Sequence, residues 1–169
     1  MTEIKQRAVS AAQKLQRIEQ ILNAAEARFV DASFSQIRLV DIAADVGITK
    51  AAFYRYFRNK ELLFLALYAR QTTLLVNNVT THLKEQSFVD ALTNAICKQP
   101  LYCKLTSILH TILEHNLTVE EAVAFKVALV EQMSKFVVQL SPHLSLTQEH
   151  LVNRFLMLHH AMIGAWANC

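Results

Sequence analysis

The chain has 169 residues, of which 53% are hydrophobic, with two glycines, two prolines and a net charge of +3. So few turn-forming residues argue against a loop-rich fold and predict an almost entirely helical protein. Residues 1–69 contain ten Lys and Arg against seven Asp and Glu, whereas residues 70–169 contain seven of each. The positive excess therefore lies in the first part of the chain, where it favours contact with nucleic-acid phosphates.

Cysteines and histidines give no metal or disulfide pattern. Cys97, Cys103 and Cys169 are odd in number and lack Cys-x-x-Cys spacing, and the seven histidines show neither HxxxH nor HExxH spacing. We therefore expect no metal and no cofactor, and a reducing compartment. A signal peptide and an 18-residue apolar run are also missing, so a cytoplasmic protein without a membrane contact is expected.

The N-terminal residues leave two interpretations open. Residues 2–16 include Lys5, Arg7 and Lys14 and contain no Pro or Gly. They either extend the first predicted helix, which we favour, or form a basic arm that follows a DNA backbone.

Two short helices are predicted on either side of Gly47. Leu39, Ile42, Ala43 and Val46 form the inner side of the first of these helices. Glycine is rare in this chain, so its presence here indicates a positive φ between two helices at a steep angle. Thr49 is a suitable N-cap for the second helix. The pattern predicts a helix-turn-helix whose second helix enters the DNA major groove.

The second helix has an aromatic side and a basic side. Helical spacing puts Phe53, Tyr56 and Phe57 on the first, with Ala52 at its edge. The other side is predicted to face DNA, and its members are Lys50, Ala51, Tyr54, Arg55 and Arg58.

Positions along this face predict different contacts. Lys50 and Ala51 lie in the first turn, where base edges are reached, whereas Tyr54 and Arg55 are expected on phosphates. Lys60 follows Asn59, the predicted N-cap of the next helix. A cation at the positive end of a helix is unfavourable, so we expect a DNA phosphate beside Lys60.

These residues resemble the tetracycline-repressor (TetR) family. The resemblance covers about residues 17–65, and its motifs are Arg17-Ile18-x-x-Ile21-Leu22-x-Ala24-Ala25-x-x-x-Phe29, Asp41-Ile42-Ala43-x-x-x-Gly47-Ile48-Thr49-Lys50 and Phe53-Tyr54-Arg55-Tyr56-Phe57-x-x-Lys60-x-x-Leu63. It implies a three-helix DNA-binding head, a helical ligand-binding body, and a homodimer that represses transcription until a small molecule binds. Carried over to this chain, it assigns Lys50, Ala51 and Ala52 to bases, and Tyr54 and Lys60 to phosphates.

The chain departs from the family pattern before the second helix. Ser33 stands where glycine is usual, and Ile37 and Arg38 replace a threonine pair that commonly caps that helix. Losing the cap should cost about 1 kcal/mol unless Ser35 replaces it. Arg38 is then available for a phosphate. The full set of predicted phosphate contacts is Arg38, Thr49, Tyr54, Arg55, Arg58 and Lys60.

Five further helices are predicted beyond the head, giving about eight in an all-α fold. Their ranges are 61–85, 87–97, 101–115, 119–140 and 147–168. We accordingly expect a helix-turn-helix domain over residues 1–60 and a ligand-binding and dimerisation domain over residues 61–169.

The last two predicted helices have broader apolar faces than burial against one neighbour requires. They predict an isologous four-helix interface in a homodimer, and thus a palindromic operator on double-stranded DNA. The expected interface residues are Val130, Phe136, Val137, Leu151, Phe155, Leu158 and Met162.

A ligand cavity is implied by the resemblance alone. Tyr102, His110 and Phe125 are candidate lining residues for an apolar or amphipathic effector, although ordinary core packing explains them too. An enzyme is not expected, because the chain lacks a nucleophile elbow, a phosphate loop and a metal signature. The alternative function keeps the DNA-binding head with a body that senses thiol oxidation or a protein partner.

Overall fold

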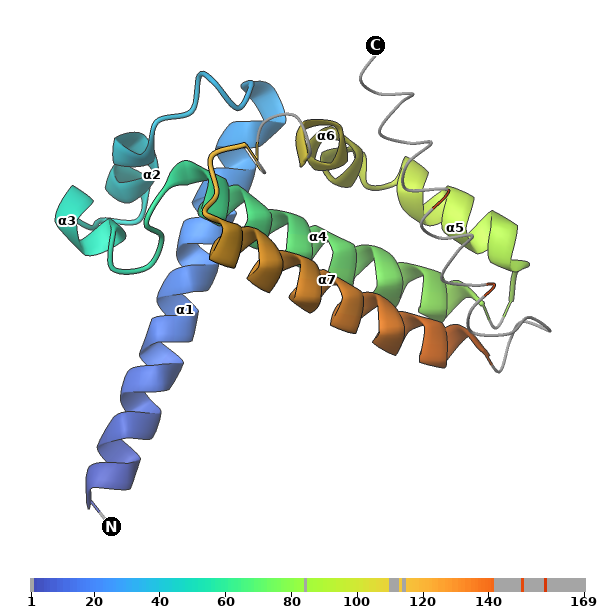
Figure 1. The fold of residues 1–169 in the computed structure, drawn as a ribbon, viewed down its shortest axis with the longest axis horizontal. Coiled ribbons are helices and arrows are strands. Elements are labelled where there is room, and N and C mark those ends of the chain that lie inside the picture. The colour runs from blue at the N-terminus through green and yellow to red at the C-terminus, as the bar shows by residue number, and fades with distance from the viewer. Residues whose placement is uncertain are drawn as a thin grey trace. The chain divides into compact units, whose positions relative to one another are not determined.

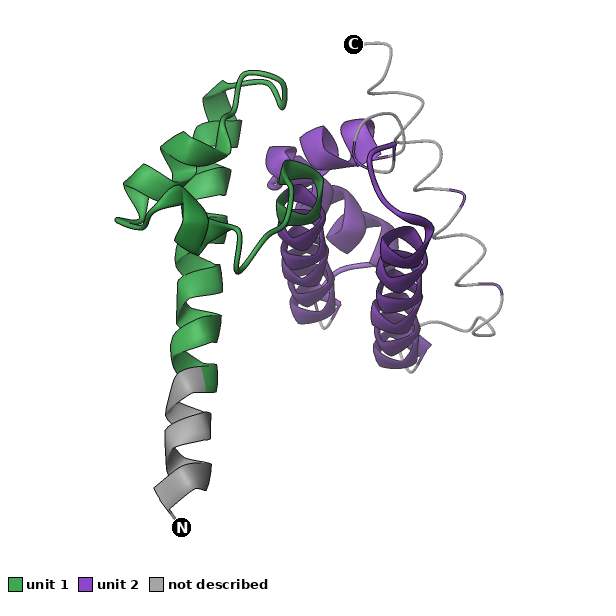
Figure 2. Ribbon diagram, turned by 60° about the vertical axis from the view of Figure 1, so that its left-hand side comes forward, with its two compact units in different colours: residues 1–63 green, residues 64–169 purple. Residues whose placement is uncertain are grey.

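The computed structural model of the chain describes residues 2–83, 85–109, 113, 115–141, 150 and 157, with side chains from residue 11 onward. It divides the chain into two compact units, residues 1–63 and 64–169, which we call the head and the body (Figure 2). The regular elements in the described parts are α-helices, as predicted for an all-α protein. None of these described helices has the length and apolar character needed to cross a membrane.

The head contains three helices and the start of a fourth (Figure 1). These are α1 (Thr2–Asp31), α2 (Leu39–Asp45), α3 (Lys50–Phe53) and the first turn of α4 (Lys60–His82). The helical extension favoured for residues 2–16 is confirmed, because they belong to α1. Buried side chains from these four elements and from the loops between them make up the core of the head, and they are Ile21, Leu22, Ala25, Phe29, Phe34, Ile37, Ile42, Ala43, Phe53, Phe57 and Leu63.

The body is built from the rest of α4 with α5 (Phe88–Cys97), α6 (Pro100–Ile108) and α7 (Val119–Leu140). Ser87 caps α5, and a reciprocal capping box between Thr118 and Glu121 begins α7. Helices α4 and α7 lie side by side (Figure 1), where Gln132 Nε2 donates to Ala69 O at 3.2 Å and to Thr73 Oγ1 at 2.6 Å.

The described residues bear on some of the predicted boundaries. The compact units divide after Leu63, within α4, and the predicted functional domains over residues 1–60 and 61–169 stay a prediction. Helix α6 begins at Pro100 rather than at Leu101, since proline needs no amide partner at the first helical position. Its α-helical part ends at Ile108, and Leu109 and Leu113 are π-helical, while the predicted end near residue 115 falls among residues that are only partly described. The helix predicted over 147–168 lies outside the described residues, apart from positions 150 and 157.

Candidate nucleic-acid interface

Gly47 makes the turn between α2 and α3. Its φ is +67°, a conformation that side chains with a Cβ rarely adopt, although a Cβ there would meet no atom within 4 Å. The amides of Gly47 and Ile48 donate to Ala44 O at 3.0 Å and Ala43 O at 2.9 Å, which closes the end of α2. The predicted glycine turn is therefore confirmed, and backbone conformation rather than lack of space requires glycine.

The recognition segment, residues 49–58, begins with the predicted cap. Thr49 Oγ1 accepts from the Ala52 amide at 3.1 Å. Helix α3 is only four residues long, but backbone hydrogen bonds continue the winding: Tyr56 N donates to Phe53 O at 2.9 Å and Phe57 N donates to the same oxygen at 3.2 Å. The helical spacing assumed from the sequence thus holds past the end of the regular helix.

Burial divides this segment as predicted. Phe53 and Phe57 are 1% and 7% exposed, with ring centroids 6.1 Å apart, and Tyr56 is half-buried beside them. The exposed members form what we call the basic face, and they are Lys50, Ala51, Tyr54, Arg55 and Arg58. Ala52, predicted to face bases, is half-buried at the edge of this face.

Lys50 and Tyr54 lie together within the basic face. The Lys50 ammonium is 5.9 Å from the centroid of the Tyr54 ring, within the range of a cation–π contact. Tyr54 is 44% exposed, and its ring meets the edge of the buried Phe53 ring. The buried phenylalanine therefore positions the tyrosine, and the tyrosine in turn offers a surface to the lysine.

Arg38 starts α2 without capping it. Its side chain makes no capping hydrogen bond; instead Nε and Nη2 donate to the Asp41 carboxylate, each at 2.8 Å. This hydrogen bond holds the pKa of Asp41 below its ordinary value. The guanidinium is 72% exposed, so a phosphate could reach it only in competition with Asp41. Its predicted phosphate contact stays a prediction.

Lys60 has a structural role that the sequence did not indicate. Asn59 caps α4 as predicted, because its Oδ1 accepts from the Leu62 amide at 2.8 Å. Lys60 Nζ donates to the carbonyl oxygens of Phe34 and Ile37, the second at 2.8 Å, and lies 4.2 Å from the Phe34 ring centroid. Burial lowers the pKa of Lys60.

These carbonyl oxygens stabilise the positive charge of Lys60 at the N-terminus of α4. The sequence analysis had assigned that stabilising role to a DNA phosphate. The amine ties the loop between α1 and α2 to the start of α4. A phosphate contact by Lys60 stays a prediction, and the electrostatic argument for it no longer requires DNA.

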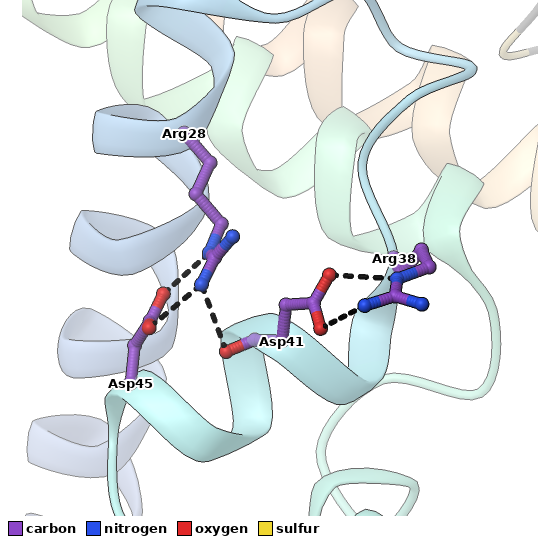
Figure 3. Close-up of polar contacts among 4 residues, drawn as sticks. All are labelled: Arg28, Arg38, Asp41 and Asp45. Carbon is purple, nitrogen blue, oxygen red and sulfur yellow. Dashed lines mark hydrogen bonds and ion pairs between the residues drawn. The ribbon is translucent and has the colours of Figure 1, made fainter.

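Two arginines on α1, Arg17 and Arg28, donate hydrogen bonds to α2 and its C-cap, and Figure 3 shows the contacts of Arg28. Arg28 Nη2 donates to Asp45 Oδ1 at 2.8 Å, and Arg17 Nη1 donates to Val46 O at 3.1 Å. The Arg28 hydrogen bond keeps the pKa of Asp45 below its ordinary value. Sequence reasoning missed this pair of contacts. The signal was available, because the two arginines lie about three helical turns apart and thus share a side of α1.

Two of the three predicted ligand residues meet in the body. Tyr102 is fully buried and stacks on Tyr68 of α4, with ring centroids 5.7 Å apart. The ring of Phe125 on α7 also packs on Tyr68, with ring centroids 6.2 Å apart. Burial raises the pKa of Tyr68 and Tyr102. His110 lies outside the described residues.

Polar side chains accompany these rings, which the sequence did not suggest. Gln71, Thr72 and Thr106 are at most 3% exposed. Both threonines donate to carbonyls of their own helices, at 2.9 and 2.8 Å. Within the described part of the chain, Gln71 Nε2 and Tyr102 Oη have no hydrogen-bond partner of good geometry. A buried polar group left without a partner costs about 1–3 kcal/mol.

The predicted dimer residues separate into three groups. Val130 is 63% exposed, whereas Phe136 and Val137 are 1% and 4% exposed within the chain itself, and therefore belong to the body's core. Leu151, Phe155, Leu158 and Met162 lie outside the described residues. Sequence periodicity could not separate the two sides of α7, because both are apolar.

Helix α7 exposes a further set of apolar residues beside Val130. We call them the valine stripe, and they are Val119, Val123, Val127, Val130 and Val138. Each is between 52% and 75% exposed, at spacings of three, four or eight residues that put them on one side of the helix.

The described thiols differ in reactivity. Cys97 is exposed, whereas Cys103 is 3% exposed and burial raises its pKa. A raised pKa lowers the thiolate fraction, so Cys103 is poorly suited to rapid oxidation. In the parts that the structure describes, no group of three or more His, Cys, Asp or Glu residues could hold a metal ion.

Comparison with known proteins agrees with this geometry. Residues 21–67 match the bacterial regulatory proteins of the tetR family, and residues 64–169 match the tetracyclin repressor-like C-terminal domain. The Transposon Tn10 TetC protein of Escherichia coli is 30% identical over 63 residues, which cover 37% of this chain and 32% of that protein. The match thus spans about a third of the relative's length. The resemblance noted over residues 17–65 is confirmed, and the chain belongs to the tetR family.

Proposed function

We propose that the protein is a repressor that binds a palindromic operator as a homodimer and is released by a small molecule. The observation that carries this proposal is the basic face, which exposes Lys50, Tyr54 and Arg55 above buried aromatic anchors. Exposed cations and a tyrosine hydroxyl on a short, capped helix suit a duplex that offers phosphates beside base edges.

Within this proposal the basic face divides its contacts. Lys50 and Ala51 reach base edges, the first as a donor to guanine and the second through its methyl group, with Ala52 at the margin. Phosphates are contacted by Arg38, Thr49, Tyr54, Arg55 and Arg58. Lys60 was also predicted to contact a phosphate, but its ammonium already donates to two backbone carbonyls, so it is left out of this proposed set. Arg55 is the best supported of these, because it is exposed and forms no ion pair with the described residues.

The valine stripe is proposed as the surface that meets a second copy of the chain. Contiguous exposed apolar side chains are unfavourable in water, and a two-fold axis would bury the same stripe on both copies. A dimer would present two recognition segments to successive major grooves, about 34 Å apart along the DNA. The operator would therefore be palindromic.

The effector is proposed to bind at Tyr68, Tyr102 and Gln71. The stacked rings favour a flat apolar portion, and the buried Gln71 amide and Tyr102 hydroxyl favour a hydrogen-bonding group, so the compound is proposed to be amphipathic. Tyr68 and Gln71 both lie on α4, the helix that leads from the head into the body. A shift of α4 on binding is the proposed route to release.

Selection of duplexes from a random library tests the DNA-binding part of the proposal. We expect enrichment of a palindrome with half-sites about one helical turn apart. Genomic footprinting would then identify the regulated genes, and compounds related to their products form the effector panel. The bound duplex should be released by a compound that raises the thermal stability of wild-type protein more than that of Tyr102→Phe.

The alternative of a thiol-sensing body has less support, because Cys103 is buried with a raised pKa. Oxidant that releases the duplex from wild-type protein but not from Cys103→Ser would favour it over a small-molecule effector.

A further inference from the structure

A polar hollow lies in the head beside the recognition segment. Its volume is about 650 Å³, and it is lined by Gln13, Lys14, Gln16, Arg17 and Gln20 of α1 with Arg55 and Tyr56. Every lining residue is polar, three are cations, and none is acidic. We call this hollow the α1 groove. Arg55 belongs both to this groove and to the basic face, so the two surfaces are continuous.

Helix α1 continues past α2 and α3 towards its N-terminal end (Figure 1). Residues 11–16 are exposed on every side, including Leu15 at 65%, and the buried core of the head begins at Ile21. These turns of helix are therefore not explained by packing within the head. A stretch of helix that is exposed on every side is available for a contact outside its own fold.

The charge of this segment is of one sign. Residues 4–18 contain four cations, Lys5, Arg7, Lys14 and Arg17, and no acidic residue. A solvated helix ordinarily mixes both signs. Lys14 is exposed and forms no ion pair with the described residues, whereas Arg17 keeps one donor on Val46 O. The groove thus offers cations and glutamine amides, which are the donors that phosphate oxygens accept from.

We propose that the α1 groove binds the sugar-phosphate backbone of the operator, next to the stretch that the recognition segment contacts. This inference rests on the proposed function, because it requires the basic face to hold a duplex. Arg55 lies where the two surfaces join, so a DNA strand held at the basic face continues into the groove. Lys14 then contacts a phosphate outside the base pairs that Lys50 and Ala51 read.

The role of Lys14 is to widen the footprint without changing sequence preference. A phosphate contact carries no base information, and it adds to the salt dependence of binding. Each lysine that neutralises one phosphate adds about 0.9 to the steepness with which log affinity falls against log salt concentration, which we call the salt slope. Two copies of the lysine on a palindrome therefore add about 1.8.

The test compares Lys14→Ala with the wild type on the duplex selected by the wild-type protein. Alanine keeps the helix, so folding should not change, and thermal melting checks this. We expect the salt slope to fall by about 1.8 and the Kd at 0.1 M salt to rise at least about tenfold. The ratio of affinities for selected and scrambled duplexes should stay constant. Lys98→Ala, which removes an exposed cation from the body, is the matched control and should have no effect.

A second duplex, trimmed by a few base pairs at each end, locates the contact. On the trimmed duplex, wild type and Lys14→Ala should bind equally, because the flanking phosphates are gone. An unchanged slope for Lys14→Ala on the full duplex overturns the inference, as does an equal loss on both duplexes. If the wild-type protein selects no duplex at all, the proposed function itself fails, and that outcome is distinct from failure of the groove.

Discussion

The head and the body expose opposite kinds of surface. The head exposes cations on its basic face, whereas the body exposes the valine stripe along α7. Cations are well solvated, so the basic face is stable without a partner and can bind DNA conditionally. A contiguous apolar stripe is unfavourable in water and needs a permanent cover. Under the proposed function, reversible control therefore belongs to the DNA contact, while the subunit contact should persist in both bound and released states.

The valine stripe allows the strongest test of this contrast. Val127→Glu with Val130→Glu should give a monomer, because two charges on each copy would be buried against each other. Loss of two-point attachment should weaken operator binding by about 10²–10⁴-fold. Sedimentation and binding titrations measure both effects. Val89→Glu, at a valine that is 69% exposed on α5, is the control. If the double variant stayed dimeric, the valine stripe would not be the dimer interface.

Phe53 and Tyr54 are adjacent residues that separate folding from binding in the head. Phe53→Ala should destabilise the head by about 3–5 kcal/mol, because the ring is 1% exposed in a small core. Tyr54→Ala should change stability by less than about 0.5 kcal/mol and still weaken DNA binding. Denaturant unfolding and hydrogen exchange over residues 39–57 report the first effect. Equal stabilities of the two variants would contradict the division into buried and exposed sides.

Lys60 tests whether a cation at the edge of the head is structural or contacts DNA. Lys60→Ala should lower the free energy of unfolding by about 1 kcal/mol, because its two hydrogen bonds to Phe34 O and Ile37 O are lost at a partly exposed site. We expect the salt slope of DNA binding to stay unchanged, since the ammonium is already engaged. A slope that falls by about 0.9 for each lysine would instead establish the phosphate contact.

Asp45 should give the smallest effect, visible mainly through its pH dependence. Its pKa is lowered from 3.8 by the Arg28 hydrogen bond, so the carboxylate stabilises the folded head above the ordinary pKa. That contribution is lost as the pH falls through the lowered pKa. Thermal melting of Asp45→Asn should therefore differ from the wild type at neutral pH, and the difference should vanish in acid. A difference that persists at low pH would mean that the ion pair is not its cause.

Local features of the head were predictable from sequence because neighbouring residues determine them. The turn at Gly47, the caps at Thr49 and Asn59, and the two sides of the recognition segment all depend on contacts within a few residues. Periodicity and capping rules are sufficient for such contacts.

Long-range polar contacts were not predictable in the same way. Lys60 reaches carbonyls more than twenty positions earlier in the chain. Gln71 and Tyr102 are both buried, although each looks ordinary in sequence. On α7, periodicity identified a broad apolar face without showing that Phe136 turns inward and Val130 outward. Only the packing of α7 against α4 distinguishes these residues.

The salt dependence of duplex binding tests the central role of the basic face most directly. Wild-type protein should bind its selected duplex with an affinity that falls steeply as salt rises, and Arg55→Ala should reduce the slope by about 0.9 for each arginine removed. Lys50→Ala should instead lower discrimination at one base pair by about 1–3 kcal/mol. An affinity that is insensitive to salt, with neither substitution having an effect, would contradict the assignment of this surface to DNA.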